Sequence, residues 1–100
     1  MSKAQASILK NSGNFAVVQM PDRNYPAMVV PGDSLHILCQ DMEELVENLV
    51  AELGSENEAV QNAKYILESL QERRSYYEEV LHSCGIELPY GLPPVLRTPS

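Results

Sequence analysis

The chain has 100 residues, with 7 Lys and Arg against 14 Asp and Glu, and 44% of its residues are hydrophobic. This length suits one small domain and excludes a large enzyme architecture. Because phosphate contacts need clustered Lys and Arg, the net charge of −7 argues against nucleic-acid and anionic-membrane partners. No segment has the pattern of a signal peptide or a membrane span, and two cysteines make no disulfide framework, so a cytoplasmic, reduced protein is expected.

The N-terminal part of the chain is expected to form a small antiparallel sheet. Segments 15–20 and 25–30 are rich in β-branched and aromatic residues, and the turn-forming residues 21–24 separate them. Small apolar and polar residues alternate over 4–10, which predicts a weaker first strand. The pattern therefore indicates a sheet of two or three strands.

A first helix is expected over 35–53. Asp33 or Ser34 can accept the free N–H groups of its first turn, and Gly54 suits the left-handed position that ends a helix. Apolar residues recur at steps of three and four and predict one buried stripe, made of Leu35, Leu38, Met42, Leu45, Leu49 and Leu53.

A second helix is expected over 56–84. Ser55 and Glu58 match a capping box, and Gly85 closes the helix. Arg74 interrupts the apolar stripe, so it is expected to form a structural ion pair with a carboxylate. The predicted stripe consists of Val60, Ala63, Leu67, Leu70, Arg74, Tyr77, Leu81 and Cys84.

These elements predict an α+β fold, a small antiparallel sheet followed by a long antiparallel two-helix hairpin. The domain is expected to span 1–88, and the Pro-rich residues 89–100 to form an extended arm that either packs locally or stays mobile. The second helix is expected to extend about ten residues beyond the start of the first, and this overhang includes Tyr77 and Val80. The sheet is expected to cover the overhang, and a second protomer is the alternative.

Two short patterns suggest chemical sites. Residues 32–35 spell the G-D-S-L signature of esterases, in which the Ser is a nucleophile, but those enzymes are longer doubly wound proteins, and helix capping explains the motif here. His36, Cys39, His82 and Cys84 are zinc-ligand types whose spacing does not favour a site, and Cys84 is expected to be buried on the apolar stripe. No catalytic residue, metal or cofactor is predicted.

Carboxylates dominate the first predicted helix, and no basic residue lies between Arg23 and Lys64. A solvated face opposite the Leu stripe is expected to carry Gln40, Glu43, Glu44 and Glu47, and like charges one turn apart on it are mildly destabilising. A face that keeps the protein in solution explains this pattern, and the alternative is a basic partner protein that neutralises the charges. Two tyrosines of the second helix, three turns apart and away from its stripe, are either ordinary exposed residues or anchors of the same interface. The predicted partner-binding residues are Asp41, Glu43, Glu44, Glu47, Tyr65 and Tyr76.

Three segments carry a family resemblance. Residues 17–26 read VVQMPDRNYP, 32–35 read GDSL and 77–89 read YEEVLHSCGIELP. With these motifs, residues 14–90 resemble a small, functionally uncharacterised bacterial domain family, some members of which look like cognate immunity proteins of polymorphic or contact-dependent toxins. The strands, the Gly-Asp-Ser sequence and the amphipathic helix are also similar to HicB-like antitoxins. The resemblance implies no catalytic residues.

The expected function is non-catalytic inhibition of another protein. In this hypothesis an immunity protein or antitoxin places its acidic surface over the basic active site of a toxin such as a nuclease. The alternative is a homo-oligomeric structural or adaptor protein, a homodimer for example, in which a symmetry mate buries the overhang. A small enzyme would need a polar constellation that the sequence does not offer.

Overall fold

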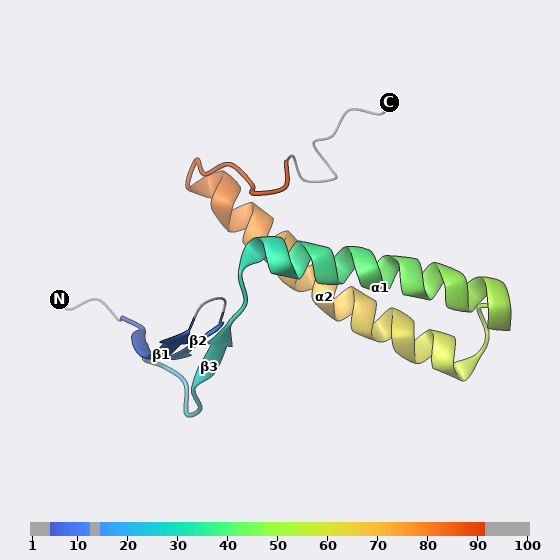
Figure 1. Ribbon diagram of the computed structural model, residues 1–100, viewed down its shortest axis with the longest axis horizontal. Helices are drawn as coiled ribbons and strands as arrows, with labels where there is room; N and C mark the ends of the chain where they lie inside the picture. The colour runs from blue at the N-terminus through green and yellow to red at the C-terminus, as the bar shows by residue number, and fades with distance from the viewer. Residues whose placement is uncertain (1–4, 13–14, 92–100) are drawn as a thin grey trace. The chain divides into compact units, whose positions relative to one another are not determined.

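The computed structural model describes residues 5–12 and 15–91. As the sequence predicts, an antiparallel β-sheet is followed by two antiparallel helices (Figure 1). The chain divides into two compact units, Met1–Pro31 and Gly32–Ser100. Neither helix combines the length and the apolar character that a membrane crossing requires.

The first unit holds the three-stranded sheet, in the order β1-β2-β3. β1 spans Ser7–Ser12, β2 spans Phe15–Gln19 and β3 spans Ala27–Val29. Both pairings are antiparallel, and a β-bulge between Ile8 and Lys10 shifts the register of β1 against β2. The first strand predicted over 4–10 therefore exists but lies nearer to the turn before β2, and residue 4 lies outside the described residues.

The turn before β3 is closed by backbone and side-chain hydrogen bonds. The Arg23 N–H donates to the Met20 carbonyl at 3.3 Å, and Gln19 Nε2 donates to the Arg23 carbonyl at 2.8 Å. Every side chain that the structure describes in this unit is half-buried or exposed. Low burial is expected here, because a small sheet alone lacks the two packed layers that form a hydrophobic core.

α1 spans Gly32–Leu53 and begins three residues earlier than predicted. A Cβ added at Gly32 would lie 1.9 Å from Cζ of Tyr77, so the tyrosine ring occupies the space that a side chain would need. Asp33 accepts the Ser34 N–H at 2.9 Å within the first turn of α1. Since the helix already begins at Gly32, neither Asp33 nor Ser34 is its N-cap residue, and the glycine of the G-D-S sequence is explained by packing against Tyr77.

α2 spans Glu58–Ser83. The predicted capping box is wrong, because the N-cap is Asn57, whose side chain accepts the Ala59 N–H at 2.8 Å. Gly54 has a φ of +84°, as expected for the residue that ends α1. At the other end of α2, Gly85 is left-handed and the Ile86 N–H donates to the Leu81 carbonyl at 2.9 Å, which is the Schellman arrangement.

The helices pack along a line that differs from the predicted Leu stripe. Leu38 and Leu45 remain 49% and 47% exposed, whereas Cys39 and Val46, one position further along α1, are buried. The stripe prediction is wrong for these two leucines because α1 is rotated toward α2 by about one residue. It is also wrong for Leu53, which is 50% exposed at the end of α1. Cys84 is exposed rather than buried, since it lies at the end of α2. The buried apolar residues are Leu35, Cys39, Val46, Val60 and Ala63.

Candidate functional site

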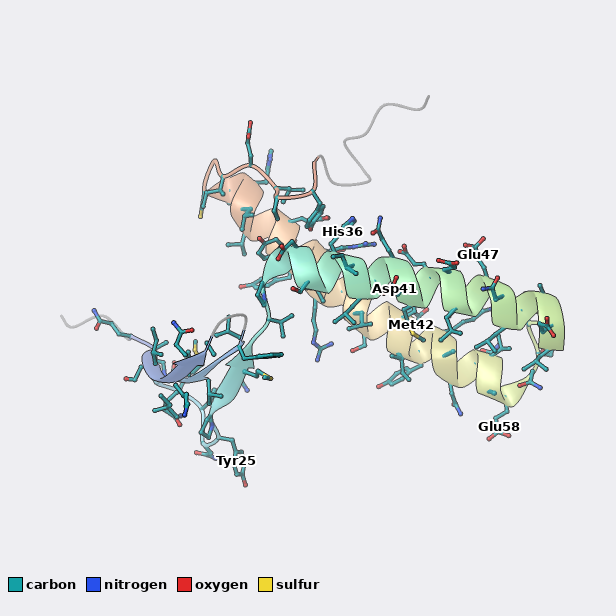
Figure 2. The ribbon with its side chains drawn as sticks, viewed as in Figure 1. Tyr25, His36, Asp41, Met42, Glu47 and Glu58 are labelled. Atoms are coloured by element: carbon teal, nitrogen blue, oxygen red, sulfur yellow. The ribbon has the colours of Figure 1, made fainter. Side chains whose placement is uncertain are left out.

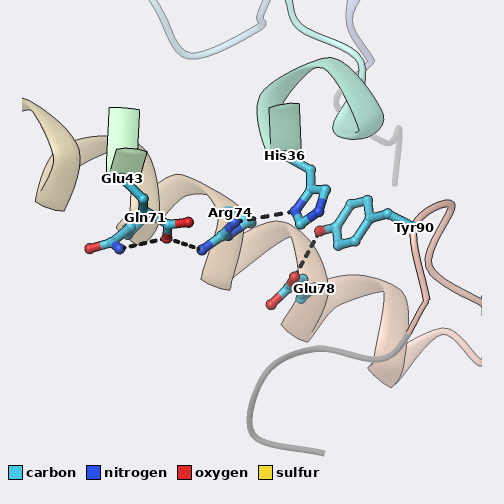
Figure 3. A network of polar contacts seen from close by, with 6 residues as sticks. All are labelled: His36, Glu43, Gln71, Arg74, Glu78 and Tyr90. Atoms are coloured by element: carbon cyan, nitrogen blue, oxygen red, sulfur yellow. Dashed lines mark hydrogen bonds and ion pairs between the residues drawn. The ribbon is translucent and has the colours of Figure 1, made fainter. Parts of the chain in front are cut away.

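A cluster of polar side chains joins the two helices on one side of the hairpin (Figure 3). We call these side chains the polar cluster and the side of the hairpin that carries them the polar side. One histidine, one arginine and one glutamate of the cluster are less than 9% exposed. The polar cluster consists of His36, Glu43, Gln71, Arg74, Glu78 and Tyr90.

Arg74 is the centre of the polar cluster. Its Nη2 lies 3.0 Å from Glu43 Oε2, which confirms the predicted structural ion pair, and Gln71 Nε2 donates to the same oxygen at 3.0 Å. Its Nη1 lies 3.2 Å from His36 Nδ1. Because a guanidinium only donates hydrogen bonds, Nδ1 accepts, and the ring proton of this neutral tautomer is on Nε2. The pair fixes how α1 and α2 are rotated against each other.

Tyr90 ties the segment after α2 to both helices. Its ring stacks on His36 with centroids 3.8 Å apart and planes at 4°, and its hydroxyl donates to Glu78 Oε2 at 2.8 Å. Burial, and next the hydrogen bond to Glu78, raise the pKa of Tyr90 well above its ordinary value. The phenol therefore stays protonated and keeps donating. The predicted arm packs locally at this residue, while 92–100 lie outside the described residues.

The polar cluster has a structural role, because its side chains form hydrogen bonds with one another. Over the described ranges, no buried side-chain nitrogen or oxygen lacks a hydrogen-bond partner. Cys39 is fully buried beside the cluster, and burial raises the pKa of its thiol, which disfavours a reactive thiolate. Nor does any group of three or more His, Cys, Asp or Glu within 5–12 and 15–91 have a geometry that could hold a metal ion.

The four predicted carboxylates of α1 do not share one surface. Glu43 turns toward α2 and pairs with Arg74, so its predicted place on the solvated face is wrong. Asp41, Glu44 and Glu47 are exposed, and Figure 2 shows Asp41 and Glu47 projecting from α1. At 100° per residue, Asp41 and Glu47 lie about 120° apart around the helix.

The two predicted tyrosines lie on one strip of α2. Tyr65 is 74% exposed and Tyr76 is 70% exposed. Three exposed glutamates continue the same helical spacing of three and four residues, and several of these side chains line a shallow depression. We call this surface the acidic strip; it consists of Tyr65, Glu68, Glu72, Tyr76 and Glu79.

The three glutamates of the acidic strip are not among the predicted site residues, because they follow Lys64 and lie outside the long segment that has acids but no basic residue. The signal was present in the spacing, because steps of 3, 4, 4 and 3 place all five residues on one line of a helix. The polar side was partly foreseen, since an ion pair of Arg74 was expected. Its partners on α1 and the stacking of Tyr90 on His36 were not.

Comparison with known proteins identifies one family. No curated protein and no solved structure matches the chain. A family model described as a family of unknown function, DUF6959, matches residues 1–90. This agrees with the resemblance of residues 14–90 to a small uncharacterised domain family. Since the match covers most of its length, the chain belongs to DUF6959.

Proposed function

We propose that the protein is a non-catalytic inhibitor that binds a basic partner protein through the acidic strip of α2. The partner class is a cytoplasmic toxin, a nuclease for example, and the protein would be its immunity protein or antitoxin. The observation that carries the proposal is the composition of this strip. Two widely exposed tyrosines and three exposed glutamates lie on one line of α2, and no basic side chain belongs to that line.

Exposed tyrosines and clustered carboxylates supply different parts of a binding energy. Tyr65 and Tyr76 offer large, rigid apolar rings with a polar tip, which is the usual chemistry of interface anchors. The carboxylates between them raise the rate at which a basic partner arrives and disfavour acidic partners. An inhibitor of a nuclease needs only these properties, because covering the basic site excludes the nucleic acid.

The charges of the hairpin support the same partner. α1 carries no Lys or Arg, and the buried Arg74 is already neutralised by Glu43. Glu68 and Glu72 are one turn apart, so they repel each other mildly and are stabilised when a cation approaches. A basic protein surface therefore gains more from this strip than a neutral one.

Affinity capture tests the proposal. The tagged chain is used as bait in its native cell extract, and a basic protein is expected to co-purify in a one-to-one ratio. The matched bait Glu68→Lys/Glu72→Lys is expected to retain less than about a tenth of the partner, because two charges then repel it. Glu43 stays unchanged, since reversing it would break the Arg74 ion pair.

A second matched bait separates local from global charge. Glu52→Lys/Glu56→Lys reverses the same number of charges at exposed positions near the turn between α1 and α2 and should leave capture nearly unchanged. Equal loss with this control would show that net charge, and not the strip, governs binding. Capture that is unaffected by the double substitution would contradict the proposed interface, and the absence of any stoichiometric partner would contradict the inhibitor hypothesis.

The alternative from sequence, a homo-oligomeric structural or adaptor protein, concerns a different surface. It is favoured by apolar side chains that remain exposed on α1 and α2, on the opposite side of the hairpin from Glu43 and Gln71. The two proposals are compatible, because self-association there leaves the acidic strip accessible.

A further inference from the structure

The hairpin has a second line of apolar residues on each helix, on the side opposite to the polar cluster. Leu38 and Leu45 lie about 160° around α1 from His36 and Glu43, respectively. On α2, Ile66 lies about 140° around the helix from Gln71. Since Glu43 and Gln71 are in contact, the apolar residues of both helices face the same way. We call this surface the apolar side; it consists of Leu38, Met42, Leu45, Leu49, Ile66, Leu70, Tyr77 and Val80.

The apolar side is open to solvent in the single chain. Leu38 and Leu45 are 49% and 47% exposed, and Ile66 and Val80 are 52% and 39% exposed. The remaining members are half-buried and continue the surface between these four. On α1 the residues recur at steps of three and four, which is the spacing of a seam between packed helices, and on α2 the same spacing includes Arg73 between Leu70 and Tyr77. The seam lies beside the one that already joins α1 to α2.

We propose that a second copy of the chain docks on the apolar side, so that two hairpins form a four-helix bundle around a two-fold axis. This inference does not depend on the proposed inhibitor function. A self-complementary surface fits it, because a two-fold axis brings the same patch of both subunits together. Paired helical hairpins with apolar seams are a common basis of four-helix bundles.

The size of the apolar side fits a weak dimer. Its members lie within residues 38–49 of α1 and 66–80 of α2, which are about 17 Å and 21 Å of helix. Two packed helices are about 20 Å wide, so the side covers roughly 400 Å² on each copy. A pair of copies then buries about 800 Å², which is the size of a weak, transient interface.

Charges select one arrangement of the two copies. α1 carries acids but no Lys or Arg, so stacking α1 on the partner's α1 would place carboxylates near carboxylates. Stacking α1 on the partner's α2 brings an acid near a base instead. Within one hairpin Glu43 is level with Gln71 and Arg74, so Asp41 is at the height of Arg73.

A two-fold axis parallel to the helices preserves these heights. It places Asp41 of one copy beside Arg73 of the other, twice in each dimer. Arg73 lies on the seam of α2, between Val80 and Ile66 around the helix. Asp41 and Arg73 are both exposed in the single chain. Arg73 donates to the Ser69 carbonyl at 2.9 Å, which leaves further N–H groups of its guanidinium for a carboxylate.

Solution mass tests the proposal on the full chain. At about 100 μM, where a dimer with a micromolar Kd is mostly formed, light scattering is expected to give twice the chain mass of 11.1 kDa. Ile66→Glu should return the mass to that of one chain, whereas Glu72→Lys on the acidic strip should leave it doubled. A wild-type mass of one chain would overturn the proposal and leave the chain's own β-sheet, or another protein, as the occupant.

A charge swap tests the arrangement without replacing any apolar residue of the seam. Asp41→Arg and Arg73→Asp should each weaken self-association about tenfold or more, because each places like charges together. An equimolar mixture of the two variants should recover the doubled mass, since every introduced charge then meets an opposite charge in the heterodimer. Failure of the mixture to recover, with a dimeric wild type, would overturn the stacking of α1 on the partner's α2.

Discussion

The two sides of the α1–α2 hairpin are completed in different ways. On the polar side, Arg74, Glu43 and Tyr90 form specific pairs, and each pair holds two segments in one orientation. On the apolar side, residues such as Leu45 and Ile66 remain about half exposed and have no fixed partner in the single chain. The hairpin therefore obtains its internal register from polar contacts, while its apolar surface is available for association.

Removing Arg74 should have the largest effect on the polar side. In Arg74→Ala, Glu43 and His36 lose the donors that they now share at 3.0 and 3.2 Å. Because Glu43 retains partial contact with water, we expect the free energy of unfolding to fall by about 2–3 kcal/mol rather than by the full cost of a buried charge. Urea unfolding followed by circular dichroism measures this.

Lys64→Ala is the matched control for that loss. It removes a positive charge from the same helix, at a half-buried residue that is not a member of the polar cluster. The expected change is within about 0.5 kcal/mol. If both variants lose the same stability, the polar cluster contributes only through net charge and does not set the register of the helices.

Gly32→Ala tests the contact that closes the open end of the hairpin. Its new Cβ would overlap the ring of Tyr77, so the ring must move, at a cost of about 1–3 kcal/mol. In the background of Tyr77→Leu the same substitution should cost clearly less, because the shorter side chain vacates the space. A full thermal double-mutant cycle gives this coupling, and purely additive effects would contradict the packing explanation of Gly32.

Tyr90→Phe has the smallest expected effect at neutral pH, about 1 kcal/mol for the hydrogen bond to Glu78. The pKa of this phenol is raised in the folded protein, so the folded state holds the proton more tightly than the unfolded state. The contribution of Tyr90 to the free energy of unfolding is fully present below the ordinary tyrosine pKa of about 10, and it decreases as the pH rises above that value. Unfolding curves at alkaline pH should show a weaker pH dependence in the Phe variant; identical slopes would contradict the shift.

Local signals were sufficient to predict the elements of this fold. Turn residues and β-branched segments located the strands, and Gly54 and Gly85 marked the ends of both helices because each adopts a positive φ. Capping was less certain, since Ser55 and Asn57 are both good N-cap residues. The structure uses Asn57. Choices between neighbouring candidates of this kind depend on geometry that a sequence pattern does not contain.

The rotation of α1 could not be predicted from its apolar spacing. Cys39 and Val46 compete with Leu38 and Leu45 for the same interface, and apolar spacing alone favours the larger leucines. The polar pairs decide the outcome, because the contact of Glu43 with α2 requires the rotation that buries the smaller residues. For the same reason, local sequence patterns did not predict the contacts between segments that are far apart in the sequence.

The association rate of the captured partner tests the central claim, that the acidic strip recognises a basic protein. The rate is measured at low and at physiological salt for the wild type and for Glu68→Lys/Glu72→Lys. We predict a rate that is high at low salt and falls steeply as salt screens the carboxylates, and a slower, much less salt-sensitive rate for the variant. Equal rates and equal salt dependence in the two proteins would contradict recognition through this strip.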